Sequence, residues 1–202
     1  TKFVPNGNLE TAIHGSGEER LGLPLDLTKR LDIIISTAQT IVYLHNLCDS
    51  PIVHCHLRPT NILLDENFEV RVSDYGTATL LWSHLQQESR ASSSSSGATM
   101  GYIAPEVAVK TQVGSQADVY SFGVVLMEVM TKKWPTVSLV SESGEKISLR
   151  QWVATGINGG GLVTVVDPFL TEKMSEREGE KMLNLLKISL LCTKEIPEDR
   201  PS

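Results

Sequence analysis

The sequence predicts a mostly α-helical domain with a small β region. Two long stretches, 27–47 and 119–131, carry apolar residues at helical spacing, and short runs near 62–64 and 70–72 have the pattern of strands. The 202 residues are 41% hydrophobic and 21% charged. This composition supports one domain with one sizeable core.

The N-terminal segment is expected to be a turn followed by a linker. Residues 3–9 contain Pro5 and Asn6-Gly7, which favour a turn, and a polar, glycine-containing stretch continues to about Pro24. A long buried helix is then expected over 27–47. Its apolar positions are Leu27, Leu31, Ile34, Ile35, Ala38, Ile41, Val42 and Leu44.

The centre of the chain is expected to hold short strands around a polar loop. Ile52-Val53 and the run 62–64 flank that loop, and Val70 and Val72 alternate with polar residues. Loops that rigid elements position frequently carry chemistry. The run Ser92 to Ser96 is too polar to bury and predicts a mobile segment.

Three features organise the C-terminal half. Asp118 is expected to cap a central buried helix over 119–131, and residues 156–161 form a predicted glycine-rich loop. An amphipathic helix is predicted over 181–192. The residues expected to face the core are Phe122, Val125, Leu126 and Val129 in the first helix, and Leu185, Ile188 and Leu191 in the second.

Charge and composition exclude several classes of protein. Eighteen Lys and Arg against 24 Asp and Glu give a net charge of -6, which argues against nucleic acid or an anionic membrane as a partner. The three cysteines, Cys48, Cys55 and Cys192, predict neither a disulfide framework nor a zinc ribbon. No stretch reaches the ~20 apolar residues of a membrane span, so the chain is expected to be soluble.

Five motifs occur in a fixed order along the chain. They are IVHCHLRPTNILLD at 52–65, VSDYG at 72–76, YIAPE at 102–106, DVYSFG at 118–123 and the late Arg200. The first three resemble the catalytic loop, the DFG element and the APE element of protein kinases, and the last two match further kinase landmarks. The sequences of residues 3–9, 104–106, 118–123 and 149–152 resemble those of plant leucine-rich-repeat receptor-like kinases, particularly the flagellin-sensing immune receptor subgroup.

This resemblance implies a partial protein kinase domain over 1–202. It would comprise the hinge and the C-lobe, with an activation segment at about 74–106. No GxGxxG loop, VAIK-type lysine or partner glutamate is found, so the N-lobe is expected to be absent. The last helix is expected to be truncated after Arg200, which would leave apolar surface uncovered. Both ends are therefore expected to be cuts.

The resemblance also implies ATP and Mg²⁺ as cofactors. Asp74 stands at the DFG aspartate and Asn61 lies five residues after the catalytic position, so both are candidate Mg²⁺ and nucleotide ligands. Arg58 replaces the usual catalytic-loop lysine and keeps its positive charge.

His56 stands where the family has its catalytic aspartate. A neutral imidazole can accept a proton but brings no negative charge, and loss of a positioned base costs ~10²- to 10⁴-fold in rate. The expectation is an impaired enzyme, a pseudokinase. Cys55 replaces the arginine that would pair with an activation-segment phosphate, and Ala98 replaces a glycine before Thr99. Whether Thr99 or the run Ser92 to Ser96 is phosphorylated is a question that the sequence leaves open.

Four other residues are expected to have structural roles. His54 resembles the packed histidine of kinase catalytic loops, Asp118 is a kinase landmark, and Glu106 and Arg200 resemble a buried ion pair. Residues 54–56 are three possible zinc ligands, but a zinc site usually draws its four ligands from two separated clusters, and the sequence offers no second cluster. The glycines at 159–161 do not predict a phosphate-binding loop, because no GK[ST] ending follows them. A hydrolase is not indicated either, because the sequence has no GxSxG motif.

Three functional readings remain open. They are a pseudokinase that signals through partners, an active Ser/Thr kinase when full-length, and a truncated gene product without a role of its own. The resemblance implies protein substrates or signalling partners, including co-receptor kinases, at the cytoplasmic side of the plasma membrane. No membrane contact is expected within the chain itself.

Overall fold

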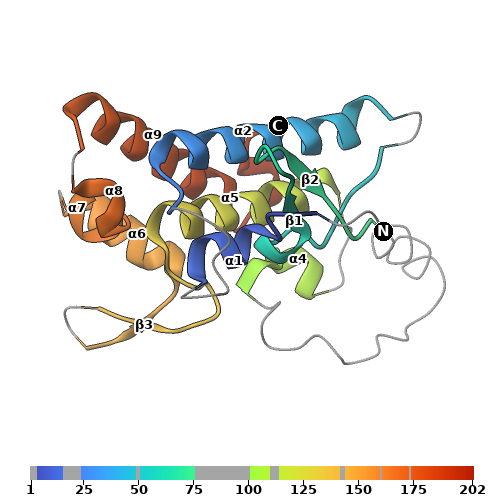
Figure 1. The fold of residues 1–202 in the computed structure, drawn as a ribbon. Helices are drawn as coiled ribbons and strands as arrows, with labels where there is room; N and C mark the ends of the chain where they lie inside the picture. Colours follow the sequence, from blue (N-terminus) through green and yellow to red (C-terminus); the bar gives the residue numbers. More distant parts are fainter. Residues whose placement is uncertain are drawn as a thin grey trace.

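The architecture is mostly helical with two small antiparallel sheets, as the sequence predicts (Figure 1). The computed structural model describes residues 4–15, 24–48, 51–75, 101–109, 114–141, 144–159, 161–172 and 174–202. Most of the predicted activation segment, including Ser92 to Ser96, Ala98 and Thr99, lies outside the described residues.

Eight α-helices are seen in the described residues: α1 (Leu9–His14), α2 (Leu27–Asn46), α4 (Pro105–Ala108), α5 (Ser115–Thr131), α6 (Leu149–Asn158), α7 (Leu162–Val165), α8 (Pro168–Thr171) and α9 (Glu176–Cys192). Two 3₁₀ helices are η2 (Pro59–Asn61) and η4 (Pro197–Asp199). Strand β1 (Ile62–Leu64) pairs with β2 (Val70–Val72), and β3 (Leu139–Val140) pairs with β4 (Lys146–Ile147). The hairpin β3–β4 is not anticipated by the sequence pattern.

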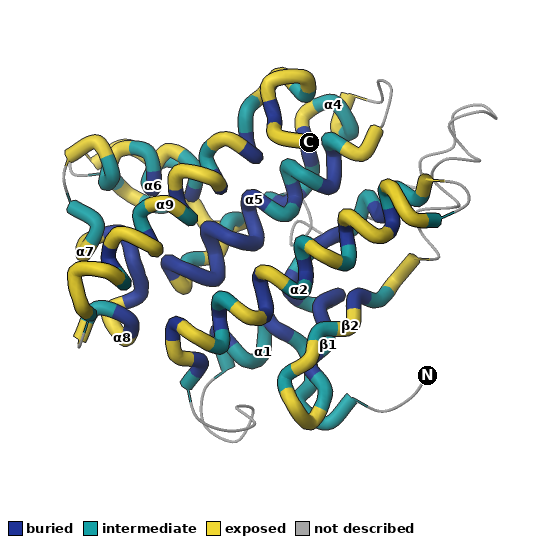
Figure 2. Tube along the Cα trace, turned by 90° about the horizontal axis from the view of Figure 1, so that it is seen from above, coloured by how far each residue is buried: buried dark blue, intermediate teal, exposed yellow. Residues whose placement is uncertain are grey.

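Helix α5 is the centre of the core. It packs between α9 and α6 on one side and α2 on the other (Figure 2). Every residue from Gly123 to Thr131 is buried, which confirms the predicted central helix. A helix that is apolar on all sides is stable only when neighbours cover all of it.

Helix α2 confirms the long predicted helix, but its buried face differs in detail. Ile35 and Val42 are about half exposed, and Arg30 and Thr37 take buried positions instead. The guanidinium of Arg30 donates from Nε to the Leu25 carbonyl (2.9 Å) and from Nη2 to Asp167 (2.5 Å). These hydrogen bonds let a charged side chain replace an apolar one in the core.

The prediction of a linker up to about Pro24 is wrong for residues 9–14, which form α1. The Asn8 side chain accepts a hydrogen bond from the Thr11 amide and caps the helix. Leu9 and Ile13 are both buried, so two apolar residues one turn apart are enough to dock this short helix. The predicted turn just before it is present, with Gly7 at φ 65°.

Three further local expectations are corrected. Ile52-Val53 is not a strand, because Ile52 donates its amide to Leu44 at the end of α2 instead of to a sheet. Asp118 does not cap α5, whose N-cap is Gly114; it lies inside the first turn. Gly156 belongs to α6, so the glycine-rich loop begins only after Asn158.

The predicted C-terminal helix exists as α9, but the predicted apolar face is rotated. Its buried residues are Gly179, Met182, Leu186, Ser189 and Cys192. Ile188 and Leu191 are 44% and 48% exposed. The close approach of α9 to α5 selects this face: a Cβ added at Gly123 would lie 2.6 Å from the Cys192 Cβ.

Candidate active site

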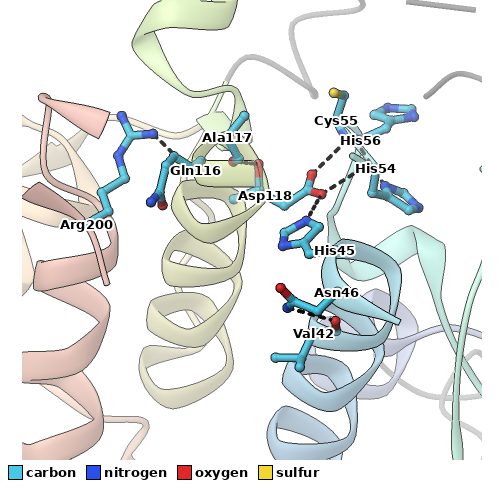
Figure 3. Close-up of polar contacts among 11 residues, drawn as sticks. Val42, His45, Asn46, His54, Cys55, His56, Gln116, Ala117, Asp118 and Arg200 are labelled. Atoms are coloured by element: carbon cyan, nitrogen blue, oxygen red, sulfur yellow. Dashed lines mark hydrogen bonds and ion pairs between the residues drawn. The ribbon is translucent and has the colours of Figure 1, made fainter. Parts of the chain in front are cut away.

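The predicted catalytic loop runs from the end of α2 to η2 and is held from behind by Asp118. The carboxylate accepts the backbone amides of His54 and Cys55, both at 2.7 Å (Figure 3). Asp118 is fully buried, and Cys55 has a left-handed backbone with φ 58°. Two hydrogen bonds to a buried charge hold the loop in a conformation that a non-glycine residue seldom adopts.

A third contact to Asp118 comes from His45, near the end of α2. Its Nε2 lies 2.8 Å from Asp118 Oδ2. Figure 3 shows His45 and the loop backbone converging on this carboxylate from different elements. His45 was missed in the sequence, where its only signal is a polar residue one position after the apolar Leu44.

His54 connects the loop to the segment that carries Asp74. Its buried ring accepts the His56 amide at Nδ1 (3.2 Å) and lies 2.9 Å from the Ser73 carbonyl through Nε2. Because the carbonyl needs a donor and the amide an acceptor, these contacts fit a neutral ring protonated at Nε2. His54 is thus a packed residue that positions both sides of the site.

The structure brings His56, Asp74 and Asn61 together at the front of the loop. His56 Nδ1 lies 2.7 Å from Asp74 Oδ2, and the Asn61 amide donates to the His56 carbonyl at 2.8 Å. The side chains of His56 and Asp74 are 24% and 41% exposed. Asp74, the predicted DFG aspartate, therefore makes a hydrogen bond with His56, which stands at the predicted position of the catalytic base.

Arg58 and Cys55 are the neighbouring residues predicted to be substitutions in the catalytic loop. Arg58 precedes η2 in an extended conformation, and its charge opposes the rise in the pKa of Glu10 that burial and Glu128 cause. Burial, followed by the nearby Asp118 charge, raises the pKa of the Cys55 thiol to about 12. This thiol stays protonated at neutral pH and is a poor nucleophile.

Arg200 and Glu106 form a bidentate pair away from the loop. The two guanidinium nitrogens lie 2.6 and 2.8 Å from the two carboxylate oxygens, and Arg200 also donates to the Gln116 carbonyl at 2.8 Å. Burial alone would raise the pKa of Glu106, but the Arg200 hydrogen bonds, a backbone hydrogen bond and the Arg200 charge together outweigh burial and lower it. The pair joins α4, the start of α5 and the chain after α9.

A second buried carboxylate, Glu128, was missed in the sequence. It accepts from the Tyr102 hydroxyl at 2.5 Å and lies 2.8 Å from His14 Nε2, whose ring stacks on Trp134. Burial and then Glu128 raise the pKa of Tyr102. The signal available in the sequence was one acidic residue inside an apolar run, which needs a buried partner.

Two residues of the site have donor groups that suit the Mg²⁺ implied by the kinase fold. A carboxylate and an amide oxygen are hard ligands that suit Mg²⁺, and nucleotide phosphates and water ordinarily complete its shell. Asp74 and Asn61 fit that role, although the Asp74 carboxylate already has His56 as a partner. Within the described parts of the chain, no group of three or more His, Cys, Asp or Glu could hold a metal.

Comparison with known proteins identifies the family. The model of the protein kinase domain matches residues 1–202, so the chain belongs to the protein kinase family. It is 38% identical over 201 residues to Receptor-like protein kinase 5 of Arabidopsis thaliana, covering 100% of this chain and 19% of the relative. It is 34% identical over 209 residues to the leucine-rich repeat receptor-like protein kinase PEPR1 of the same plant, covering 100% and 18%.

The relatives support receptor-like kinase membership. The chain spans about a fifth of the length of the curated relatives that it matches. They do not single out the flagellin-sensing subgroup, which stays a prediction. No helix among the described residues is long and apolar enough to cross a membrane.

Proposed function

We propose that this chain is the C-lobe part of a receptor-like Ser/Thr kinase domain whose phosphoryl transfer is strongly impaired, and that it acts through protein partners. The observation that carries the proposal is the 2.7 Å contact between His56 Nδ1 and Asp74 Oδ2. It involves both the position of the catalytic base and the position of a metal ligand.

The first effect concerns the base. An aspartate at position 56 would accept the proton of a substrate hydroxyl and attract it electrostatically. When His56 donates its Nδ1 proton to Asp74, that nitrogen cannot accept another proton. The imidazole also lacks the negative charge that would orient the hydroxyl donor.

The second effect concerns the metal ligand. Bound Mg²⁺ would supply charge neutralisation of the phosphates, and Asp74, whose Oδ2 already lies 2.7 Å from His56 Nδ1, would share its carboxylate between the cation and this ring. Asn61 is 8% exposed and donates its amide N–H to the His56 carbonyl, so it holds the loop and can offer only its oxygen. The residues keep a nucleotide-binding capacity while losing catalytic power.

The receptor setting belongs to the same proposal. Leucine-rich repeat receptor-like kinases occur among the relatives, which supports a role at the cytoplasmic side of the plasma membrane with co-receptor kinases or other signalling proteins as partners. The finer assignment to the flagellin-sensing subgroup rests on the sequences of residues 3–9, 104–106, 118–123 and 149–152.

The test restores the aspartate in protein expressed from the full open reading frame. His56→Asp should raise Mg²⁺-dependent autophosphorylation about 10²- to 10⁴-fold over the wild type, because a positioned base returns. His56→Asp combined with Asp74→Asn is the control and should be silent. A wild type that transfers phosphate as fast as His56→Asp would instead favour an active Ser/Thr kinase with His56 as its base.

A further inference from the structure

We propose that a hollow between α5, the start of α6 and the chain just after α9 is a docking site for a short extended segment of a partner protein. The segment would carry a large apolar residue between an acidic and a basic one. This inference rests on the proposed function, because it states the kind of partner through which the chain acts. The described residues that line the hollow include none of the catalytic loop at 52–65.

Packed elements form the walls of the hollow. One wall is the face of α5 that carries Tyr120, Val124 and Met127. Helices α6 and α9 pack beside α5, and the ends of these two helices nearest the hollow complete its outline (Figure 2). At one edge, a Cβ added at Gly101 would lie 3.0 Å from the backbone of Pro135, so the two segments already touch.

The floor of the hollow is apolar. Val124, Met127 and Leu149 line it, and each of them is at most 5% exposed. A side chain that covers this floor leaves water, and the gain grows with the apolar area that it buries. The floor therefore favours a large apolar side chain over a polar one.

The size of the hollow indicates an extended ligand. Its volume is about 380 Å³, near the lower end of the roughly 300 to 1,000 Å³ of ligand pockets. One turn of a helix, about 10 Å across and 5.4 Å long, would already fill roughly 420 Å³. The hollow thus suits one or two side chains of an extended segment better than a helix.

Two opposite charges, Arg150 and Glu195, line the same hollow. Among the described residues, neither side chain forms an ion pair or a hydrogen bond, with each other or with a third group. Burial raises the pKa of Tyr120, and among the nearby charges Arg150 opposes this rise while Glu195 adds to it. Both charges therefore act on the same part of the hollow.

The charges set the chemistry of the partner. Arg150 has a buried Nε without a hydrogen-bond partner among the described residues, and a guanidinium in this state gains from a carboxylate beside it. An acidic residue of the segment would pair with Arg150, and a basic residue would pair with Glu195. A segment with acidic residues on both sides would be repelled at Glu195, so the site distinguishes partners by the order of their charges.

The experiment selects peptides without any phosphotransfer. A phage library of random heptapeptides is selected on protein from the full open reading frame. We expect the enriched peptides to share a large apolar residue with an acidic residue on one side and a basic residue on the other. A synthetic copy of the most enriched peptide is then titrated by fluorescence anisotropy.

Arg150→Glu is the decisive variant. It should weaken binding of this peptide about tenfold, because an attraction becomes a repulsion. A glutamate in the first turn of α6 suits the helix dipole, so the variant is expected to fold. A second peptide, in which lysine replaces the acidic residue, should bind Arg150→Glu about tenfold more tightly than the first peptide does.

Lys146→Glu is the matched control, because it makes the same change of charge at an exposed position of β4 that does not line the hollow. It should alter binding of the first peptide by less than about twofold. A selection without the shared pattern, equal losses in Arg150→Glu and Lys146→Glu, or no recovery with the lysine peptide would each overturn the proposal.

The two proposals can fail separately. If the wild type transfers phosphate as fast as His56→Asp, the proposed impairment is wrong, but peptide binding that depends on Arg150 would still support the docking site. If transfer is low and the selection yields no such peptide, only the docking site is wrong.

Discussion

The rear of the catalytic loop, where Asp118 lies, and its front, where His56 and Asp74 lie, differ in burial and in hydrogen bonding. At the rear, the fully buried Asp118 accepts two backbone amides and contacts His45. At the front, His56 and Asp74 are partly exposed and make one contact with each other at 2.7 Å. The part of the site that positions the loop is hydrogen-bonded to a buried carboxylate, whereas the part predicted to do chemistry is partly exposed.

In this structure the contacts of Asp118 that hold the loop conformation do not include the His56 side chain. The left-handed backbone of Cys55 is held by Asp118 and by its burial, and neither contact involves the His56 side chain. A kinase-like loop is therefore formed with His56 at the predicted position of the catalytic aspartate. The predictions below test whether Asp118 stabilises the loop independently of the His56 side chain.

The largest effect on stability is expected at the rear of the loop. Asp118→Ala leaves two buried amides without an acceptor, and each such loss costs roughly 1 to 3 kcal/mol. We expect the free energy of unfolding of the kinase domain to fall by about 3 to 5 kcal/mol in urea titrations. Asp32→Ala, on the exposed face of α2, is the control and should change it by less than about 0.5 kcal/mol. Equal decreases in the free energy of unfolding for Asp118→Ala and Asp32→Ala would contradict the role of Asp118 in holding the loop.

An intermediate effect is expected at the Glu106–Arg200 pair, and it depends on pH. The pKa of Glu106 is lowered from 4.5, so the pair's stabilisation is present above that pH and lost as the pH falls through the lowered value. Glu106→Gln should lower the free energy of unfolding by about 1 to 2 kcal/mol at pH 7.

The gap between wild type and Glu106→Gln should close on acidification below about pH 4.5. Urea unfolding measured from pH 7 to pH 3 checks this. A gap that widens as the pH falls would contradict the assigned direction of the shift.

The smallest effect on stability is expected at the front. His56→Ala removes a partly exposed contact, which should change the free energy of unfolding by less than about 1 kcal/mol. Protection of the His54 and Cys55 amides from hydrogen exchange should also persist, because Asp118 binds them. Loss of that protection would show that the front helps to hold the loop.

Much of the fold was predictable because apolar spacing reports on local structure. Helices α2, α5 and α9 and strands β1 and β2 were all expected near their observed positions. Helix α1 was missed because its six residues give too short a repeat to stand out from the polar residues around it. The hairpin β3–β4 has two residues per strand and gives even less signal.

The faces of the helices were less predictable than the helices themselves. Ile188 and Leu191 share apolar character with Leu186, yet α9 buries Leu186 and exposes the other two. The choice depends on where α5 comes close, at Gly123, and a sequence pattern does not include the neighbouring helix. Arg30 is buried for a similar reason, since its partner Asp167 lies 137 residues away.

The sequence by itself determined the family and predicted which residue stands at each kinase position, including His56, because ordered motifs with fixed spacing are a property of the chain. Only the tertiary structure decided that His56 contacts Asp74, that His45 joins Asp118 and that Glu128 meets His14 and Tyr102. These contacts join residues from 18 to 114 positions apart. Hydrogen bonds act over about 3 Å, so which distant groups meet is settled by the packing of whole elements.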